Sequence, residues 1–369
     1  MKQEPHLCPD AEDDLHDSPK NSAFRAGDIL TVRALSGLSG DMMLAGLLYL
    51  SGLYTKDEEL EHFHVENALL TQVRQPPQRG VDFGENDVFP QNDALKHSVF
   101  QKQNTLDALL ATMPVPTLSG CVRLERRFVR HIAGWGCHIE LPPEHEHRTH
   151  ADIMALINAS SMEPAAASLA LRTFSLLAEA EGRVHGLPAA EVRFHEVGAL
   201  DSILDICLTC ALFVRLAPAH FVCSPLPIGD GGILCAHGWI PTPAPAVLEL
   251  LTGIPVCGFF GTPAQEANHP EQAEQAEHHG HHGNHENRHH STAATSATVR
   301  GCGETVTPTA IALLKALGAT FGAWPAMTVR DRALVYGSRV FDNAPNGAIW
   351  ACGTSNTPAT SKGGKHGHA

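Results

Sequence analysis

Residues 28–50 read DILTVRALSGLSGDMMLAGLLYL, and they predict a strand, a glycine-containing loop and a helix in direct succession. The first eight residues have the character of a strand. Gly37 and Gly40 permit a tight turn with close backbone approach. The apolar run that follows closes at Gly52, a residue suited to a helix C-terminus. The order of strand, loop and helix indicates an α/β body.

Strands and helices alternate along the rest of the chain. Residues 121–141 predict two strands that turn at Gly134, and residues 192–197 predict another. Two more strands are expected near HFVCS and GILCA, and helices over residues 149–157, 165–184, 201–216, 245–252 and 308–317. We therefore expect an α/β fold, with α+β as the alternative, in which helices flank a mixed sheet. Residues 56–120 predict little beyond short helices near DEELEHFH and TLDALLAT.

One body, residues 27–342, is expected between two disordered tails, residues 1–26 and 343–369. A polar insertion, residues 262–300, interrupts this body and holds most of the eight-histidine stretch from Gly261 to Ser291. Its apolar residues are too few to offset the entropy of ordering, so it is expected to be a disordered loop. Imidazole is the commonest transition-metal ligand, and the loop therefore indicates metal handling. An expression tag or a drifted low-complexity loop is the alternative.

Composition narrows the class of partner. A formal net charge of −14 argues against nucleic acid, because the Lys and Arg clusters that bind phosphate are missing. The N-terminal residues lack a signal-peptide apolar core, and no run approaches the roughly 18 apolar residues of a membrane span. We expect a cytoplasmic protein that binds no membrane. The C-x-x-C of Cys207 and Cys210 lies inside an apolar helical run, which favours packing over redox chemistry.

The loop at residues 36–40 is the first candidate site. Ser36, Gly37, Ser39 and Gly40 precede a helix whose free N–H groups attract anions, so they are expected to hold phosphate or carboxylate. Asp41 at the helix start would bind a cation or accept a proton. The alternative is a capped helix after a tight turn, with no ligand.

The segment FHEVGALDS is the second candidate. His195 and Glu196 are adjacent polar groups, and Asp201 begins a helix with Asp205 one turn later on the same face. Two carboxylates and an imidazole there can bind a divalent ion or perform acid and base chemistry. Asp201 as a helix cap and Glu196 as a surface residue are the alternative. Asp205 lies among apolar residues, and a buried carboxylate needs a partner.

Other histidines are candidates for metal or ligand binding. His145 and His147 alternate with glutamates, so an extended segment would place both imidazoles on one side. A solvated loop would have the same sequence pattern. His237 precedes a proline-rich stretch that can fix a binding wall, or form a surface connection.

Six motifs occur in the order seen in LarC-type nickel insertion proteins, the nickel chelatases of nickel-pincer cofactor biosynthesis. They are SGLSGDMMLAGLL, HEHRTHADIMALINASSM, LLAEAEGRVHG, FHEVGALDSILDI, PLPIGDGGILCAHGWIPTPAPAVLELLTGIPV and GETVTPTAIALLKAL. The resemblance spans residues 29–53 and 121–342. It implies CTP-dependent insertion of nickel into pyridinium-3,5-bisthiocarboxylic acid mononucleotide, a lyase-class reaction that forms a nickel–carbon bond. The product is the cofactor of lactate racemase and related enzymes.

Roles follow when the residue chemistry is placed on these motifs. Asp41, His195, Glu196 and Asp201 are expected to organise metal and cofactor. Ser36, Gly37, Ser39, Gly40 and His237 would hold the mononucleotide. The expected metal ligands are histidines, namely His145, His147, His278, His279, His281, His282, His285, His289 and His290.

The chain also departs from the family pattern. Arg33 stands where the family usually has Asp. Ala310 follows Thr307-Pro308-Thr309, at the position where the family usually has Gly. The C-terminal domain that binds CTP with a divalent cation in full-length members is not evident. We therefore expect a first part, a truncated product or a degenerate copy, with a separately encoded C-terminal part and a second copy of the chain as candidate partners. A non-catalytic protein that stores or delivers nickel is the second hypothesis.

Overall fold

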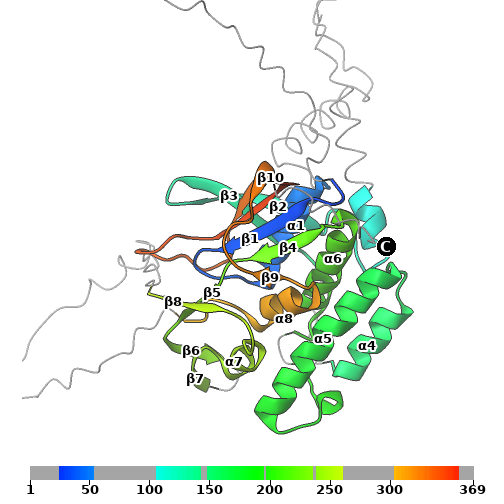
Figure 1. Ribbon diagram of the computed structural model, residues 1–369. Coiled ribbons are helices and arrows are strands. Elements are labelled where there is room, and N and C mark those ends of the chain that lie inside the picture. The colour runs from blue at the N-terminus through cyan, green and yellow to red at the C-terminus, as the bar shows by residue number, and fades with distance from the viewer. Residues whose placement is uncertain are drawn as a thin grey trace, which may run out of the picture.

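The computed structural model describes residues 25–53, 105–142, 148–194, 197–235, 238–260 and 303–356 (Figure 1). The expected histidine-rich insertion and most of the expected N-terminal tail lie outside these ranges. Within them the chain forms a mixed sheet with helices packed against it, so the predicted α/β class is confirmed.

The main sheet has seven strands in the described part of the chain, in the spatial order β2-β3-β10-β11-β1-β4-β9. Their bounds are β1 (Ile29–Ala34), β2 (Val122–Val129), β3 (Ile132–Ile139), β4 (His220–Cys223), β9 (Thr320–Phe321), β10 (Met327–Val335) and β11 (Ala348–Ser355). β1 pairs parallel with β4 and antiparallel with β11. The predicted first strand is therefore an interior strand, and all six of its residues are buried.

Two small sheets lie apart from the main one. β5 (Leu226–Gly229) pairs parallel with β8 (Val256–Phe259), and β6 (Gly231–Cys235) pairs antiparallel with β7 (Gly238–Thr242). In Figure 1 they lie beside α7 (Pro245–Leu250). Both strand pairs and α7 therefore come from one stretch of the chain, between residues 226 and 259.

The helices build up in layers from the sheet. α1 (Gly40–Ser51) packs on β3 and β10, α6 (Leu200–Leu216) packs on α1, and α5 (Pro164–His185) packs on α6 and α8 (Pro308–Ala316). α4 (His150–Ala159) packs on α5, as Figure 1 shows. A short 3₁₀ turn, η1 (Ala189–Glu191), follows α5.

The helix ends follow from local chemistry. Thr149 caps α4 by accepting the backbone N–H of Asp152, whose side chain accepts the N–H of Thr149 in return. Gly52 and Gly186 end α1 and α5 in the left-handed conformation, each with φ of 67°. These boundaries confirm the helices predicted from the same residues.

A close approach of helix and sheet centres on Gly46 and Trp350. A Cβ on Gly46 would overlap the indole of Trp350, so glycine lets α1 lie directly on β11. Trp350 is fully buried and stacks on Phe221 of β4, with ring centroids 6.0 Å apart. This contact fixes the height of α1 above the sheet, and thus the position of the α1 N-terminus.

Three predictions need correction. The hairpin of β2 and β3 turns at Arg130 and His131, both with positive φ, and not at Gly134. Gly134 instead lies within β3, where a Cβ would overlap the Tyr336 ring. Of the strand expected at residues 192–197, the described residues 192–194 form only a single bridge, from Arg193 to Thr149.

The third correction concerns the tail expected from residue 343. Residues 348–355 form β11, which joins β1 to β10 in the interior of the main sheet. Ala348, Trp350, Ala351 and Cys352 are all buried.

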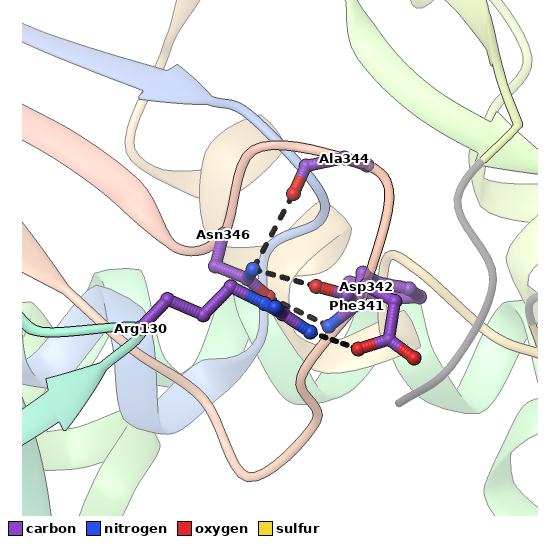
Figure 2. A network of polar contacts seen from close by, with 5 residues as sticks. All are labelled: Arg130, Phe341, Asp342, Ala344 and Asn346. Atoms are coloured by element: carbon purple, nitrogen blue, oxygen red, sulfur yellow. Dashed lines mark hydrogen bonds and ion pairs between the residues drawn. The ribbon is translucent and has the colours of Figure 1, made fainter. Parts of the chain in front are cut away.

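The loop between β10 and β11 is tied down by a polar network, shown in Figure 2. The Asn346 side chain accepts the backbone N–H of Phe341 at 2.8 Å and donates to the carbonyl oxygens of Phe341 and Ala344 at 2.9 and 3.3 Å. Arg130, from the β2–β3 turn, forms an ion pair with Asp342 of the same loop. The network therefore joins the β2–β3 hairpin to the β10–β11 loop.

In the described ranges, the structure contains no helix of the length and apolarity needed to cross a membrane.

Candidate functional site

A pocket of about 600 Å³ lies where the first turns of α1, α6 and α8 meet the last turn of α5. Strands β6 and β7 and the start of α7 form its opposite wall. Residues from Ser39 to Thr309 of the sequence therefore contribute to one cavity. Five of the six sequence motifs contribute residues to the lining of this pocket, so the lining comes from segments far apart along the chain.

The charge of the pocket is mostly negative. Four carboxylates line it, those of Asp41, Glu181, Asp205 and Glu304. His185 adds an imidazole and Arg193 a guanidinium. A surplus of carboxylates attracts cations, and a mixture of carboxylate oxygen and imidazole nitrogen suits divalent transition metals.

An apolar wall faces these charges. Its members are aliphatic or aromatic side chains, namely Val184, Phe194, Val197, Ile233, Ile240, Ala244, Pro245 and Ala246. Phe194 is buried, packs edge-on against Phe174 of α5 and is thereby held in place. A cavity with an apolar wall and a few converging polar groups is the usual form of a small-molecule site.

Asp41 lies in the first turn of α1, where the predicted glycine loop delivers it to the pocket. The Ser39 hydroxyl donates a short hydrogen bond to Asp41 Oδ1. Ser39 is the N-cap residue, but its side chain makes no capping bond to the helix. The Ser39 side chain therefore contacts the aspartate instead of capping the helix N-terminus.

Asp205 lies one turn into α6, directly against Gly40. A Cβ on Gly40 would overlap Asp205 Oδ2, so only glycine fits there. Asp205 Oδ1 is inaccessible to solvent and has no hydrogen-bond partner. Burial raises the pKa of the Asp205 carboxyl well above its ordinary value, and the nearby carboxylates of Asp41 and Asp201 add to the shift.

Ser36 and Gly37 belong to a different environment from Ser39 and Gly40. The buried Ser36 hydroxyl oxygen accepts the backbone N–H of Gly347 at 3.1 Å. Gly37 packs against the Thr305 carbonyl, leaving no room for a side chain. Both residues line a smaller cavity of about 130 Å³, which shares Ser39, Glu304 and Thr307 with the larger one.

The backbone of Leu38 is also engaged. Its N–H donates to Thr305 O and its carbonyl accepts from Thr307 N, both at 3.0 Å. These bonds join the loop before α1 to the loop before α8. The predicted phosphate loop therefore divides: residues 36–38 build the joint, and Ser39, Gly40 and Asp41 face the pocket.

Asp201 is exposed on the first turn of α6 and is absent from the pocket lining. Its Oδ1 accepts the N–H of the following Ser202 at 2.8 Å. It acts on the site through its charge, as one of the groups that raise the pKa of Asp205. Other predicted residues lie outside the described ranges, namely His145, His147, His195, Glu196, His237 and the histidines from His278 to His290.

Five titratable residues of the pocket were not among the predicted site residues: Glu181, His185, Arg193, Asp205 and Glu304. Glu181 and His185 carried a detectable signal, because a spacing of four places both on one helix face. Asp205 carried one too, as a carboxylate within an apolar helix. Cys207 and Cys210 are buried in α6 with raised thiol pKa values, about 12 for Cys210, because burial disfavours the thiolate. This supports the packing interpretation of the C-x-x-C.

Within the described ranges, no three His, Cys, Asp or Glu side chains converge closely enough to hold a metal ion by themselves. The pocket thus differs from a structural metal site, which is a closed cage of ligands.

Comparison with known proteins identifies relatives over most of this sequence. The sequence profile of a family described as nickel insertion protein matches residues 30–361. A protein of Geotalea uraniireducens (strain Rf4) named for nickel insertion is 35% identical over 239 residues, covering 64% of this chain and 50% of that protein. One of Geobacter sulfurreducens (strain ATCC 51573 / DSM 12127 / PCA), also named for nickel insertion, is 38% identical over 221 residues, 60% of this chain and 44% of its own.

A third relative has a more specific name. The pyridinium-3,5-bisthiocarboxylic acid mononucleotide nickel insertion protein of Nocardioides sp. (strain ATCC BAA-499 / JS614) is 35% identical over 215 residues, 58% of this chain and 44% of that protein. The chain spans about half the length of the curated relatives it matches. No solved structure matches it.

Proposed function

Because the chain belongs to the nickel insertion protein family, we propose that it inserts nickel into pyridinium-3,5-bisthiocarboxylic acid mononucleotide. The observation that carries this proposal is the 600 Å³ pocket, in which carboxylates face an apolar wall. The mononucleotide has a flat, positively charged aromatic ring, an anionic phosphate and two sulfur-bearing groups that bind metal. Each part has a matching feature in the lining.

The carboxylates of Asp41 and Asp205 are proposed to hold nickel before transfer. The Asp41 carboxylate helps to raise the pKa of Asp205, and Asp205 Oδ1 has no hydrogen-bond partner among the described residues. A buried carboxylate without a partner is unfavourable, so a divalent cation that pairs with it is stabilised. Carboxylate oxygen is a hard ligand, and the softer thiocarboxylate sulfurs of the substrate would draw nickel away from it.

Arg193 and the apolar wall are proposed to orient the mononucleotide. The guanidinium matches the geometry of one phosphate group. Phe194 and Ile240 offer flat and apolar contact to the pyridinium ring. When nickel bonds to the ring carbon between the two thiocarboxylates, that carbon loses a proton, so the net reaction exchanges H⁺ for Ni²⁺ there.

We also propose that the reaction depends on CTP and supplies the cofactor of lactate racemase-type enzymes, as the resemblance implies. One guanidinium in the pocket fits a monophosphate better than a triphosphate with its divalent ion. CTP is therefore assigned no position in this pocket, and a separately supplied C-terminal part is the proposed place for it. The histidines between His278 and His290 are proposed to collect nickel for the pocket.

Storage or delivery of nickel without catalysis is the second candidate function. It is favoured by the lining carboxylates and the histidine-rich segment, which would serve storage equally well. Arg33 also favours it as a departure from the family pattern. The two functions differ in the fate of the mononucleotide, which storage leaves unchanged.

The deciding experiment incubates the purified chain with the mononucleotide, Ni²⁺ and CTP, with and without the C-terminal half of a full-length relative. Mass spectrometry follows the metallated product. Product in either mixture supports insertion. Nickel bound to the chain with no product in both mixtures would overturn the insertase proposal and favour storage.

A deletion of residues 262–300 tests the role of the histidine-rich segment. Nickel collection predicts that the deletion reduces product at scarce Ni²⁺ and leaves it unchanged at saturating Ni²⁺. Equal loss at both concentrations would contradict that role.

A further inference from the structure

Glu181 and His185 form a pair on the last turn of α5. His185 Nε2 lies 3.4 Å from Glu181 Oε2, and the two residues are four positions apart on one helix face. The side chain of His185 is 32% exposed and that of Glu181 is 27% exposed, and both residues line the large pocket. They are therefore accessible from solvent and also face the cavity.

The position of the pair at a helix end favours a cation. His185 is the last residue of α5, and Gly186 ends the helix with its N–H bonded to Gly182 O. The carbonyl groups of the last turn carry partial negative charge, which stabilises positive charge nearby. Glu181 adds a full negative charge one turn earlier. A cation at this position is therefore attracted both by the carbonyl groups of the helix end and by the Glu181 carboxylate.

We propose that Glu181 and His185 form an entry site that receives nickel from solvent and passes it to Asp41 and Asp205. This inference rests on the proposed function, since it assigns a path within the same pocket. One imidazole nitrogen and one carboxylate oxygen are ligands that nickel accepts. Two protein ligands leave most of the coordination sphere to water, so the ion is held weakly enough to move on.

An ordinary surface ion pair is the competing interpretation. Glu and His at this spacing stabilise a helix by about 0.2–0.5 kcal/mol and need no ligand. Two observations favour the entry site. Both side chains line the pocket as well as reaching solvent, and the same pocket is lined by Asp205, whose buried Oδ1 has no hydrogen-bond partner. A pair placed only to support the helix gains nothing from that location.

Nickel-dependent protection of His185 from diethyl pyrocarbonate tests the proposal residue by residue. The intact chain is labelled over a series of buffered free Ni²⁺ concentrations, without mononucleotide or CTP. Peptide mass spectrometry then reports each histidine separately, so binding by the histidine-rich segment does not obscure His185. His220, exposed at the start of β4 and absent from the pocket lining, is the internal reference for folding.

Glu181→Gln and Glu179→Gln form the matched pair of variants. Glu179 lies on the same helix, is exposed and is absent from the pocket lining. We expect Ni²⁺ to protect His185 equally in the native chain and in Glu179→Gln. In Glu181→Gln, the free Ni²⁺ concentration that gives half-maximal protection should be at least about tenfold higher. Mg²⁺ should give no protection, because it prefers oxygen ligands.

Equal labelling of His185 with and without Ni²⁺ would overturn the proposal, and so would protection that Glu181→Gln leaves unchanged. Because no substrate is present, this result is independent of turnover. Failure of nickel insertion with His185 still protected would leave the entry site standing. Insertion without protection would remove the entry site and leave the proposed function.

Discussion

Gly40 and Asp205 are in close contact in the site. The α-carbon of Gly40 lies so near the Asp205 side chain that a Cβ on residue 40 would overlap Asp205 Oδ2. Gly40 is in the first turn of α1 and Asp205 in the second turn of α6, so the two residues are 165 positions apart in sequence (205 − 40). The contact explains why a glycine precedes Asp41. It brings the carboxylates of residues 41 and 205 into one pocket.

Gly40→Ala should therefore displace Asp205 and impair nickel insertion. Overpacking of this kind lowers the free energy of unfolding by about 1–3 kcal/mol. Urea unfolding and the metallation assay would measure the two effects. Gly322→Ala is the control, because nothing lies within 4 Å of a Cβ at that position. Native activity in Gly40→Ala would show that the position of Asp205 does not matter.

Asp205→Asn should separate stability from activity. Burial and two neighbouring carboxylates raise the pKa of Asp205, so the folded chain holds its proton more tightly than the unfolded chain. The stability of the native protein then falls as pH rises from the ordinary carboxyl pKa toward the raised one. Asparagine has no proton to lose in this range and avoids that loss.

The expected result is that Asp205→Asn gains stability relative to the native chain as pH increases from 4 to 8. The gain is about 1.4 kcal/mol for each tenfold difference in proton affinity. Nickel insertion should fall at least about tenfold, since a ligand is lost. Glu179→Gln, on an exposed face of α5, should change neither quantity. Parallel stability curves for the native chain and Asp205→Asn would contradict the raised pKa.

Local signals in the sequence were enough for β1, α1, α5 and α6. Gly52 and Gly186 end helices because only glycine adopts their positive φ without strain, and this property is visible in sequence. The β2–β3 turn was misplaced because Arg130 and His131 adopt positive φ although neither is glycine. β11 was missed because its support is not local: Gly353 pairs with Ile29 from the other end of the chain.

The site was predictable only in part for the same reason. Asp41 follows a glycine loop and could be recognised from that loop alone. Glu181 and His185 lie in a sequence that equally suits a solvated helix face, and only the packing of α5 against α6 and α8 turns that face into a pocket wall. The histidines expected to bind metal remain predictions.

Arg33→Met should be nearly neutral for both stability and nickel insertion. Arg33 lies on β1 with its guanidinium over the Trp324 ring at 5.7 Å, its Nη1 has no hydrogen-bond partner, and burial lowers its pKa. Loss of the cation–π contact, about 1 kcal/mol, is offset by removal of a desolvated charge. Arg33 does not line the pocket. A large loss of product with unchanged unfolding would show that the departure at Arg33 matters to the reaction.

Asn346→Ala should loosen the loop shown in Figure 2. The change removes three hydrogen bonds that close residues 341–346, and the expected loss of stability is about 1–3 kcal/mol. Asp342→Asn removes only the charge of the exposed pair with Arg130 and should cost less than about 1 kcal/mol. Urea unfolding of both variants would show the difference. Equal effects would mean that the ion pair holds the loop as strongly as the hydrogen bonds of Asn346 do.

The location of nickel in crystals of the chain with the mononucleotide tests the central claim most directly. Anomalous diffraction at the nickel absorption edge reports the position of the ion without reference to activity. We expect a nickel peak inside the pocket, bound by Asp41 or Asp205 and by the sulfur atoms of the mononucleotide. A fully occupied mononucleotide bound elsewhere, with nickel absent from this pocket, would contradict the account.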